Sequence, residues 1–445
     1  MNFSSSFPCM NGLVSWSPNG LYLLSATANR LILRDSSSLK VISNYVSSES
    51  VDQLFWSPNS QLFGMNYNAG GVTRVFRVND PDWNAKISEG SFLKVIHSFF
   101  SPDSSSVLTL SEFNLRLSIW NLTGLNKSVP FIKFPKNLDL ISFSKQFLAV
   151  VESKGQEILS IYDSLEGWQI LRSIELPSVN IVGLAWSPHD DVIALWESSL
   201  HYRILVYSID GRCLLDYSAY NLALGIKSVS WDPSGKILAI GSFDAKIRLI
   251  NALSWSVLTE LFDHSSYLDS NDMDIYEEND VPLGDIDAEA AIELSSKVCG
   301  IETHMDVVSV RPAFLSTRKV NPSSVQASNK SLGIGDIKFS SSGRYLAAKN
   351  DACASALWVW DVQKLKLKGL IVLKRPGITS FEWEPHKPRL SIAGHNQTHY
   401  VWTPMGMVNA RLPYEESEIN IFTVKWNPLG KVVACVGTER FICCK

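Results

Sequence analysis

The sequence lacks the features of a secreted, membrane-spanning or disulfide-stabilised protein. Charged residues make up only 19% of the 445 residues, and no apolar run reaches the roughly 18 residues that a membrane span needs. The N-terminal segment has no basic start followed by an apolar stretch, as a signal peptide would. The seven cysteines form neither a CxxC motif nor an even disulfide framework. We therefore expect a soluble, intracellular protein with free thiols.

Signatures of catalysis and of metal binding are also absent. The sequence holds no GxxxxGK phosphate loop, no GxSxG nucleophile turn, no HExxH zinc motif and no HRD kinase loop. The net charge of −4 argues against general binding to nucleic acid or to membranes. We predict no catalytic residue, no metal site, no cofactor and no small-molecule substrate, and we expect neither nucleic acid nor membrane as a partner.

What the sequence does contain is a repeat. An aromatic residue, usually followed by a polar residue and often by Pro, recurs every 40 to 45 residues, with one longer step of 108 residues. Short β-like apolar runs lie before and after each aromatic residue, as in residues 226–261. The nine aromatic residues that mark the copies are Trp16, Trp56, Phe100, Phe143, Trp186, Trp231, Phe339, Trp383 and Trp426.

About four short strands in a unit of about 43 residues are typical of a β-propeller blade. A single twisted sheet cannot cover both of its faces, whereas neighbouring blades in a ring cover each other. We therefore predict one all-β propeller over residues 1–445, a single closed ring of about nine blades. Seven or eight blades, or two rings, are the alternatives. The last unit ends within its third strand, so we expect the N-terminal residues to pair beside it.

The long step contains an acidic insertion at residues 263–330. Ten Asp and Glu residues but no Lys or Arg lie from Asp269 to Glu293, so the rest of the chain carries a net charge of +6. Like charge and low apolar content predict a mobile, solvated loop between blades, with strand-like sequence again at residues 307–310. Two interpretations remain open: a tolerated surface loop, or an acidic segment that binds a partner or covers a basic face.

The densest basic run is Lys-Leu-Lys-Leu-Lys at residues 364–368. Its alternation places three lysines on one face of a strand. One interpretation is a solvated outer strand whose charges prevent edge-to-edge pairing. The other is an electrostatic contact with an acidic surface.

The repeat resembles that of the WD-repeat family, although only Trp360-Asp361 is a strict Trp-Asp pair at the third-strand position. Longer segments resemble the WRAP-type centrosomal proteins of that family. These segments include residues 81–90 (PDWNAKISEG), 112–116 (EFNLR), 217–229 and 358–365.

This resemblance implies a non-enzymatic interaction scaffold in the cytoplasm and cytoskeleton, at the centrosome or spindle pole. Such a scaffold helps to anchor microtubule minus ends and to assemble the spindle, and cilia where they exist. The implied partners are a coiled-coil protein similar to the synovial-sarcoma X breakpoint-interacting protein and a minus-end-directed kinesin. A propeller subunit of a translation-initiation complex is the alternative, and it predicts a basic face.

The segments that carry the resemblance fall outside the generic blade pattern, so their side chains are candidates for contacts with partners. Buried aromatic and Arg side chains tend to anchor protein interfaces. For each candidate the alternative is a purely structural role, such as packing of Trp83 on an outer strand. The candidates are Trp83, Lys86, Glu89, Arg116, Tyr220 and Lys227.

Overall fold

The structure is a computed structural model whose described residues form β-strands and three short 3-10 helices. It describes residues 2–28, 30–46, 49–90, 93–122, 130–153, 155–178, 180–221, 223–261, 273–278, 332–373, 377–413 and 419–445, and the backbone of residues 267–268, 302–304 and 313–314. Two compact units are present: residues 13–226, and residues 1–12 together with 227–445. Among the described residues, no helix is long and apolar enough to cross a membrane.

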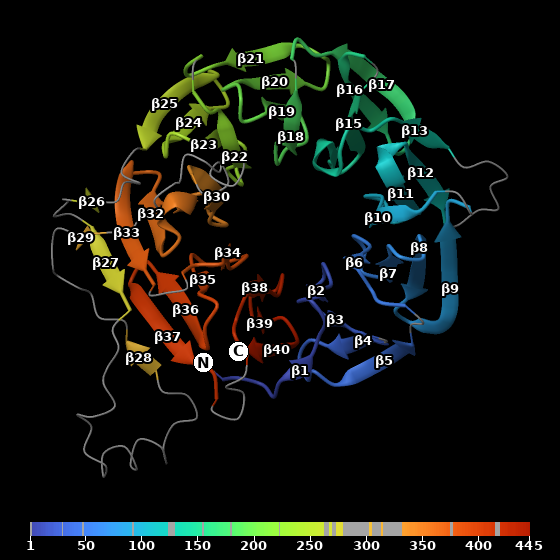
Figure 1. Cartoon of the computed structure of the whole chain (residues 1–445), viewed down its shortest axis with the longest axis horizontal. Coiled ribbons are helices and arrows are strands. Elements are labelled where there is room, and N and C mark those ends of the chain that lie inside the picture. Colours follow the sequence, from blue (N-terminus) through green and yellow to red (C-terminus); the bar gives the residue numbers. More distant parts are fainter. Residues whose placement is uncertain are drawn as a thin grey trace, which may run out of the picture. The chain divides into compact units, whose positions relative to one another are not determined.

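The unit of residues 13–226 contains five four-stranded antiparallel sheets, which are blades 1 to 5 (Figure 1). Within each blade the strands pair in chain order, so the fourth strand has a free edge. The strands are β2 (Val14–Trp16), β3 (Tyr22–Thr27), β4 (Arg30–Asp35) and β5 (Val41–Val46); β6 (Gln53–Trp56), β7 (Leu62–Tyr67), β8 (Val72–Arg77) and β9 (Asp80–Ser88); β10 (Val95–Phe100), β11 (Ser106–Ser111), β12 (Arg116–Asn121) and β13 (Phe131–Lys133); β14 (Ile141–Phe143), β15 (Phe147–Ser153), β16 (Glu157–Asp163) and β17 (Gln169–Glu175); and β18 (Ile181–Trp186), β19 (Val192–Glu197), β20 (Ile204–Ser208) and β21 (Cys213–Tyr217).

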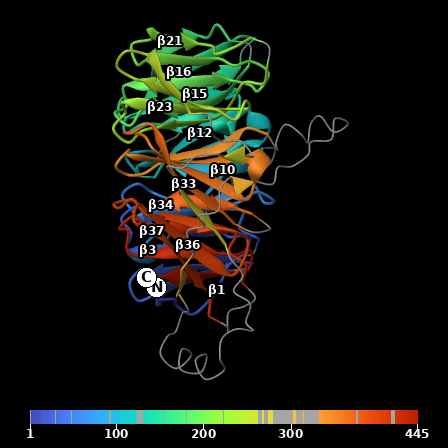
Figure 2. The same cartoon turned by 90° about the vertical axis from the view of Figure 1, so that its left-hand side faces the viewer.

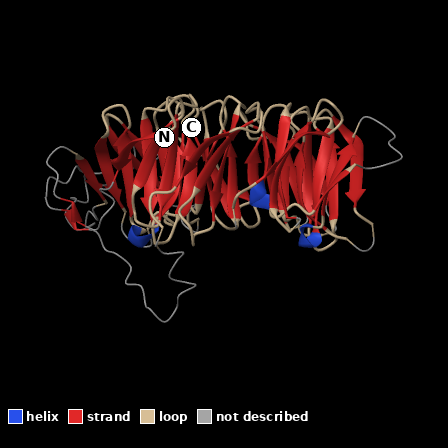
Figure 3. Cartoon of the chain, turned by 90° about the horizontal axis from the view of Figure 1, so that it is seen from above, coloured by secondary structure: helices blue, strands red, loops and turns tan. Residues whose placement is uncertain are grey.

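The other unit contains blades 6 to 9, and blade 6 starts at the boundary between the units. Figure 2 shows blades 7 and 8 from the side, and Figure 3 shows how the strands run between loops at either end. The strands are β22 (Ile226–Trp231), β23 (Ile237–Ser242), β24 (Ile247–Asn251) and β25 (Ser256–Leu261); β30 (Ile334–Phe339), β31 (Tyr345–Asn350), β32 (Ala356–Asp361) and β33 (Lys366–Val372); β34 (Ser380–Trp383), β35 (Leu390–Ala393), β36 (Thr398–Thr403) and β37 (Gly406–Arg411); and β38 (Thr423–Trp426), β39 (Val433–Val436) and β40 (Arg440–Cys444). The predicted all-β propeller with nine blades is confirmed.

The N-terminal residues complete blade 9, as predicted. Strand β1 (Phe7–Pro8) pairs antiparallel with β40, with Phe7 opposite Phe441. A further bridge joins Phe3 to Cys444, and the Asn2 amide donates to the Lys445 carbonyl at 3.1 Å. The last blade therefore has three strands from the C-terminal end of the chain and one from the N-terminal end.

The repeated residues hold the turn between the first and second strands of a blade. In blade 1 the Ser17 hydroxyl donates to Asn19 Oδ1 at 2.7 Å and accepts from the Tyr22 amide at 2.9 Å. The turn closes with Gly20 at a φ of 70°, a conformation that glycine adopts without strain. The Ser and the Asn of the repeat are thus local turn residues.

The repeated aromatic residues join one blade to the blade before it. The Trp186 indole donates to the Ser142 carbonyl at 3.0 Å, and the Trp383 indole donates to the Lys338 carbonyl at 2.9 Å. The hydrophobic cores also lie between neighbouring blades. One cluster joins blades 4 and 5, and another joins blades 7 and 8 around Trp402 and Tyr400. Such packing explains why the aromatic residue recurs once in each blade.

The acidic insertion contributes strands to other sheets. Strand β27 (Asp274–Glu277) pairs in parallel with β33, and β28 (Glu302–His304) pairs antiparallel with β37. Strands β26 (Tyr267–Leu268) and β29 (Ala313–Phe314) pair with each other. The strand predicted at residues 307–310 and most of the acidic stretch lie outside the described residues, so the predicted mobility stays a prediction. Pairing of β27 and β28 with the blades was not predicted.

Candidate interaction surface

Four exposed large apolar side chains belong to blade 3, on the β11–β12 connection and in and just after β13, and we name this set the aromatic patch. It consists of Phe113, Leu115, Phe131 and Phe134, which are 81%, 40%, 47% and 49% exposed. Phe113 lies in the 3-10 helix η1 (Glu112–Asn114), which connects β11 to β12, and Phe131 begins β13. Exposed apolar groups of this kind mark interaction sites more often than isolated exposed side chains do.

The backbone holds the aromatic patch in an unusual conformation. Phe113, Asn114 and Phe134 have φ values of 60°, 53° and 56°, which bulky residues adopt only when their surroundings fix them. The Phe134 amide donates to the Leu115 carbonyl at 3.0 Å, and the Asn114 side-chain amide donates to the Lys136 carbonyl at 3.2 Å. These bonds tie η1 to the segment after β13, so the aromatic side chains are presented on a fixed backbone.

Glu89 and Arg116, two of the predicted contact residues, form one ion pair beside this patch. The Arg116 Nε donates to Glu89 Oε2 at 2.8 Å, and the Thr109 hydroxyl donates to Glu89 Oε1 at 2.7 Å. The Glu89 side chain has no exposed surface, whereas that of Arg116 is 32% exposed. Glu89 therefore orients Arg116, whose guanidinium carbon lies 5.8 Å from the centre of the Phe131 ring.

Trp83 and Lys86 lie on β9, the fourth strand of blade 2. Trp83 is half-buried, and the Arg77 guanidinium carbon lies 4.7 Å from the centre of its ring. Lys86 is exposed and sits opposite Arg74 in the β8–β9 register. The structure thus places Trp83 in local packing and leaves Lys86 available to solvent.

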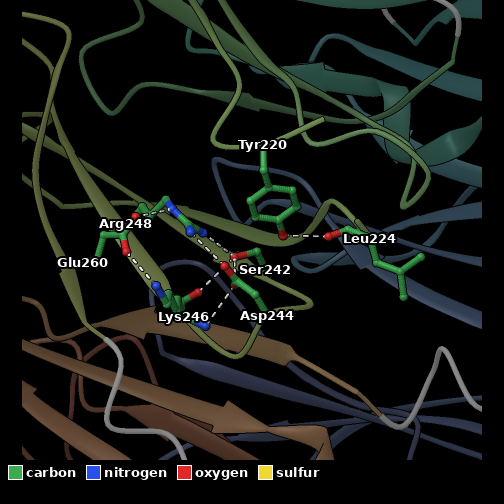
Figure 4. A network of polar contacts seen from close by, with 7 residues as sticks. All are labelled: Tyr220, Leu224, Ser242, Asp244, Lys246, Arg248 and Glu260. Carbon is green, nitrogen blue, oxygen red and sulfur yellow. Dashed lines mark hydrogen bonds and ion pairs between the residues drawn. The ribbon is translucent and has the colours of Figure 1, made fainter. Parts of the chain in front are cut away.

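Tyr220 and Lys227 have intramolecular partners, each within its own unit. The Tyr220 hydroxyl donates to the Leu224 carbonyl at 2.7 Å (Figure 4). The centre of the Tyr220 ring lies 4.9 Å from that of Tyr202. The Lys227 ammonium donates to Asp351 Oδ2 and to the Leu332 carbonyl, both at 2.6 Å. These contacts account for both side chains structurally, and their role in partner binding stays a prediction.

A polar network in blade 6 is also structural. The Arg248 guanidinium donates to Asp244 Oδ2 and Glu260 Oε1, both at 2.8 Å, and to the Ser242 hydroxyl at 2.9 Å (Figure 4). Burial raises the pKa of Asp244, but hydrogen bonds from Arg248 and Ser242 outweigh burial and hold it below the usual range. Asp244 also holds the turn between β23 and β24, since the Lys246 amide donates to Asp244 Oδ1 at 3.1 Å.

Histidine and acid side chains assemble no metal-binding cluster in the part of the chain that the structure describes. His399 is buried in β36, where its Nε2 lies 3.2 Å from the Ser391 hydroxyl, and burial lowers its pKa to about 4. His395 is exposed and lies outside that core. One of the two histidines is therefore buried in a core, and the other is exposed to solvent.

Sequence reasoning missed Phe113, Phe131 and Phe134. Segment 112–116 carries part of the family resemblance, and the residue predicted there is Arg116 and not Phe113. The sequence of a loop does not show whether an aromatic residue in it is exposed. Phe113-Asn114 does indicate a turn, because Asn favours a positive φ.

The chain is similar to known WD-repeat proteins, and one of these similarities extends over its whole length. It is 34% identical over 452 residues to WD repeat-containing protein WRAP73 of Mus musculus, covering 100% of this chain and 96% of the relative. An uncharacterised WD repeat-containing protein of Schizosaccharomyces pombe is 25% identical over 88% of this chain and 78% of its own length. A family model described as the anaphase-promoting complex subunit 4 WD40 domain matches residues 184–268.

Solved structures share the fold at low sequence identity. The C-terminal WD40 domain of Sif2 has a TM-score of 0.52 at 12% identity, covering 88% of this chain and 95% of that chain. The dihydro-heme d1 dehydrogenase NirN has a TM-score of 0.50 at 14% identity, covering 82% and 67%. Both support a propeller fold and carry no functional argument.

Proposed function

Because the chain belongs to the WD-repeat protein family, we propose that it is a non-enzymatic interaction scaffold of the centrosome or spindle pole. In that role it helps to anchor microtubule minus ends and to assemble the spindle, and cilia where they exist. The observation that carries the proposal is the similarity to WRAP73 along the whole chain, together with the resemblance of segments 81–90 and 112–116 to WRAP-type centrosomal proteins.

The geometry of the aromatic patch supports a role in protein binding. Large apolar side chains held on a fixed backbone lose little conformational entropy when a partner covers them. The partly exposed Arg116 beside Phe131 adds a cation to the rim, which suits a partner with carboxylates. The proposed partners are a coiled-coil protein similar to the synovial-sarcoma X breakpoint-interacting protein and a minus-end-directed kinesin.

Affinity capture tests this function. The tagged full chain is expressed in cells that have centrosomes, and bound proteins are identified by mass spectrometry while the chain is located by fluorescence. We expect centrosomal coiled-coil proteins in the capture and a fluorescent focus at the spindle poles. Recovery of ribosomal subunits alone would overturn the proposal and favour a translation-initiation subunit.

Two sets of variants locate the surface. Phe113→Ser with Phe134→Ser removes two exposed patch side chains, and we expect at least tenfold less partner captured. Leu253→Ser is the matched control, because Leu253 is an 82% exposed apolar residue outside the patch. Trp83→Ala and Lys227→Glu test the residues chosen from the sequence, with circular dichroism to establish folding. Equal capture by the patch variant and the control would remove the aromatic patch from the proposal.

A further inference from the structure

The outer edge of blade 7 carries a fifth strand that comes from the acidic insertion. Strand β27 pairs in parallel with β33, from Asp274 opposite Gly369 to Glu277 opposite Val372. The other four strands of the blade are antiparallel. We name the surface beneath β27 the edge slot; it consists of the free edge of β33 and the side chains of Tyr400, Trp402 and Met407.

The edge slot takes apolar side chains on both faces of the bound strand. Met273 and Ile275 are 2% and 3% exposed and pack in the core between blades 6 and 7. Tyr276 is 3% exposed and packs in the core between blades 7 and 8, with Tyr400 and Trp402. Adjacent side chains of a strand in the edge slot therefore pack into two separate hydrophobic clusters.

The edge slot also recognises carboxylates. The Lys368 ammonium pairs with Asp274 Oδ2 at 2.8 Å, and the Tyr400 hydroxyl donates to Glu278 Oε1 at 2.5 Å. Lys368 is the last lysine of the basic run at residues 364–368, and Lys364 of that run is exposed. The carboxylate at one end of the bound strand thus forms an ion pair with Lys368, and the carboxylate at the other end accepts a hydrogen bond from Tyr400.

We propose that the edge slot is a peptide-binding site that β27 occupies in cis, and that a partner protein uses it by adding an acidic, extended segment as a parallel fifth strand. The segment carries an aliphatic residue and an aromatic residue at adjacent positions, with carboxylates on either side. This inference rests on the proposed scaffold function, and it specifies the chemistry of one partner. Strand addition supplies affinity through backbone hydrogen bonds and specificity through the side-chain pockets.

The effective concentration of the tethered β27 determines how strongly it competes with a partner strand. A tethered segment acts at an effective concentration in the millimolar range, so it weakens the apparent affinity of any competing peptide. However, β27 pairs over four residues in a parallel ladder, which is slightly less stable per residue than an antiparallel one. Under the proposal, a longer partner strand with the same side-chain pattern displaces β27 because it adds backbone hydrogen bonds to the same anchors.

Fluorescence anisotropy on the full chain tests the proposal. The probe is a labelled ten-residue peptide with the sequence of residues 271–280 (NDMDIYEEND), and a scrambled peptide of the same composition is the reference. The opened variant, Ile275→Gly with Tyr276→Gly, removes two buried anchors of β27. We expect it to bind the probe at least tenfold more tightly than the unmodified chain does.

Two further variants identify the site. Glu277→Gln is the matched control, because Glu277 lies in β27 but its side chain is exposed, and its affinity should equal that of the unmodified chain. Lys368→Glu in the opened variant should weaken binding of the probe at least tenfold. If the opened variant aggregates, Ile275→Ala takes its place with an expected gain of up to about thirtyfold.

An opened variant that keeps the circular dichroism spectrum of the unmodified chain but binds the probe no better than the scrambled peptide would overturn the proposal. For the Ile275→Ala variant, an affinity equal to that of the unmodified chain would do the same. Affinity capture distinguishes a failure of the edge-slot proposal from a failure of the proposed scaffold function. Probe binding without centrosomal partners refutes the proposed function alone, and centrosomal capture without probe binding refutes the edge slot alone.

Discussion

The outer strands of blades 6 and 7 are held by opposite arrangements of charge. In β25 the acid Glu260 is 38% exposed and is held by Lys246 and Arg248 of the same blade. In β33 the base Lys368 is 39% exposed and is held by Asp274 of the added strand β27. Blade 6 is thus stabilised by its own third strand, whereas blade 7 depends on a segment from a distant part of the sequence.

This difference indicates which outer strand can exchange the segment that is paired with it. Lys246 and Arg248, which bind Glu260 of β25, belong to blade 6. They therefore stay in place when the insertion leaves the blades. The partner of Lys368 leaves whenever β27 leaves. The edge of blade 7 therefore meets the requirement of the proposed binding site, and the edge of blade 6 does not.

The largest expected effect comes from the internal network of blade 6. Arg248→Ala leaves the carboxylates of Asp244 and Glu260 without their shared cation, and the side chain of Arg248 is only 4% exposed. We expect the free energy of unfolding to fall by about 3 kcal/mol. Urea denaturation followed by fluorescence measures this change. Arg212→Ala is the control: its pair with Asp210 is exposed, and it should change stability by less than about 0.5 kcal/mol.

The next effect concerns the added strand of blade 7. Ile275→Ala removes buried methyl groups and should weaken docking of β27 by about 2 kcal/mol. Because β27 covers one edge only, the loss should appear as faster amide exchange in β33 without a change in β25. Hydrogen exchange with mass spectrometry makes the comparison. Exchange that rises equally in both strands would show that β27 supports the whole unit.

Changes of pH should affect the two edges in opposite directions. Hydrogen bonding by Lys246 lowers the pKa of Glu260 from 4.5, so its stabilising effect is complete above that value and is lost as the pH falls through the lowered value. Hydrogen bonding to Asp274 raises the pKa of Lys368 from 10.5, so its effect is complete below that value and is lost at higher pH.

Both effects should be below about 1 kcal/mol, because these side chains are partly exposed. Melting temperatures of Glu260→Gln and Lys368→Gln across the pH range measure them. Glu260→Gln should lose part of the acid slope, and Lys368→Gln should lose part of the alkaline slope. Equal slopes in the two variants would contradict the assignment.

The smallest effect is expected at Lys246. The Lys246 side chain is 40% exposed, and its ammonium lies 3.0 Å from Glu260 Oε2. Lys246 is one of two cations that pair with this carboxylate, and Arg248 is the other. Lys246→Ala should therefore lower the free energy of unfolding by no more than about 0.5 kcal/mol. A loss comparable to that of Arg248→Ala, in the same urea titration, would show that the two cations act as one unit.

The blades were predictable because their information is local. Each copy of the repeat holds its own turn, as Ser17 and Asn19 do, and the spacing of the aromatic residues sets the number of blades. Completion of blade 9 by the N-terminal residues also followed, since the last unit was one strand short. Local patterns of this kind act over a few residues and can be read directly.

The edge slot and the aromatic patch were not predictable for the opposite reason. Asp274 pairs with Gly369, a residue far along the chain, and the acidic sequence around β27 gives no sign of a buried strand. Likewise, exposure of Phe113 follows from a positive φ that the sequence only hints at through Asn114. Of the residues proposed from the sequence, Arg116 lies beside the patch, while Glu89 is entirely buried.

The pairing of β1 with β40 has a consequence for biosynthesis. Ser6 and Arg440, which are hydrogen-bonded at 3.1 Å, are 434 residues apart in sequence. At a translation rate of about 5–20 residues per second, the first strand waits roughly 20–90 s on the ribosome before its partner exists. During that interval the strand that pairs with β1 has not yet been made. Blade 9 is therefore the last of the nine blades that can form.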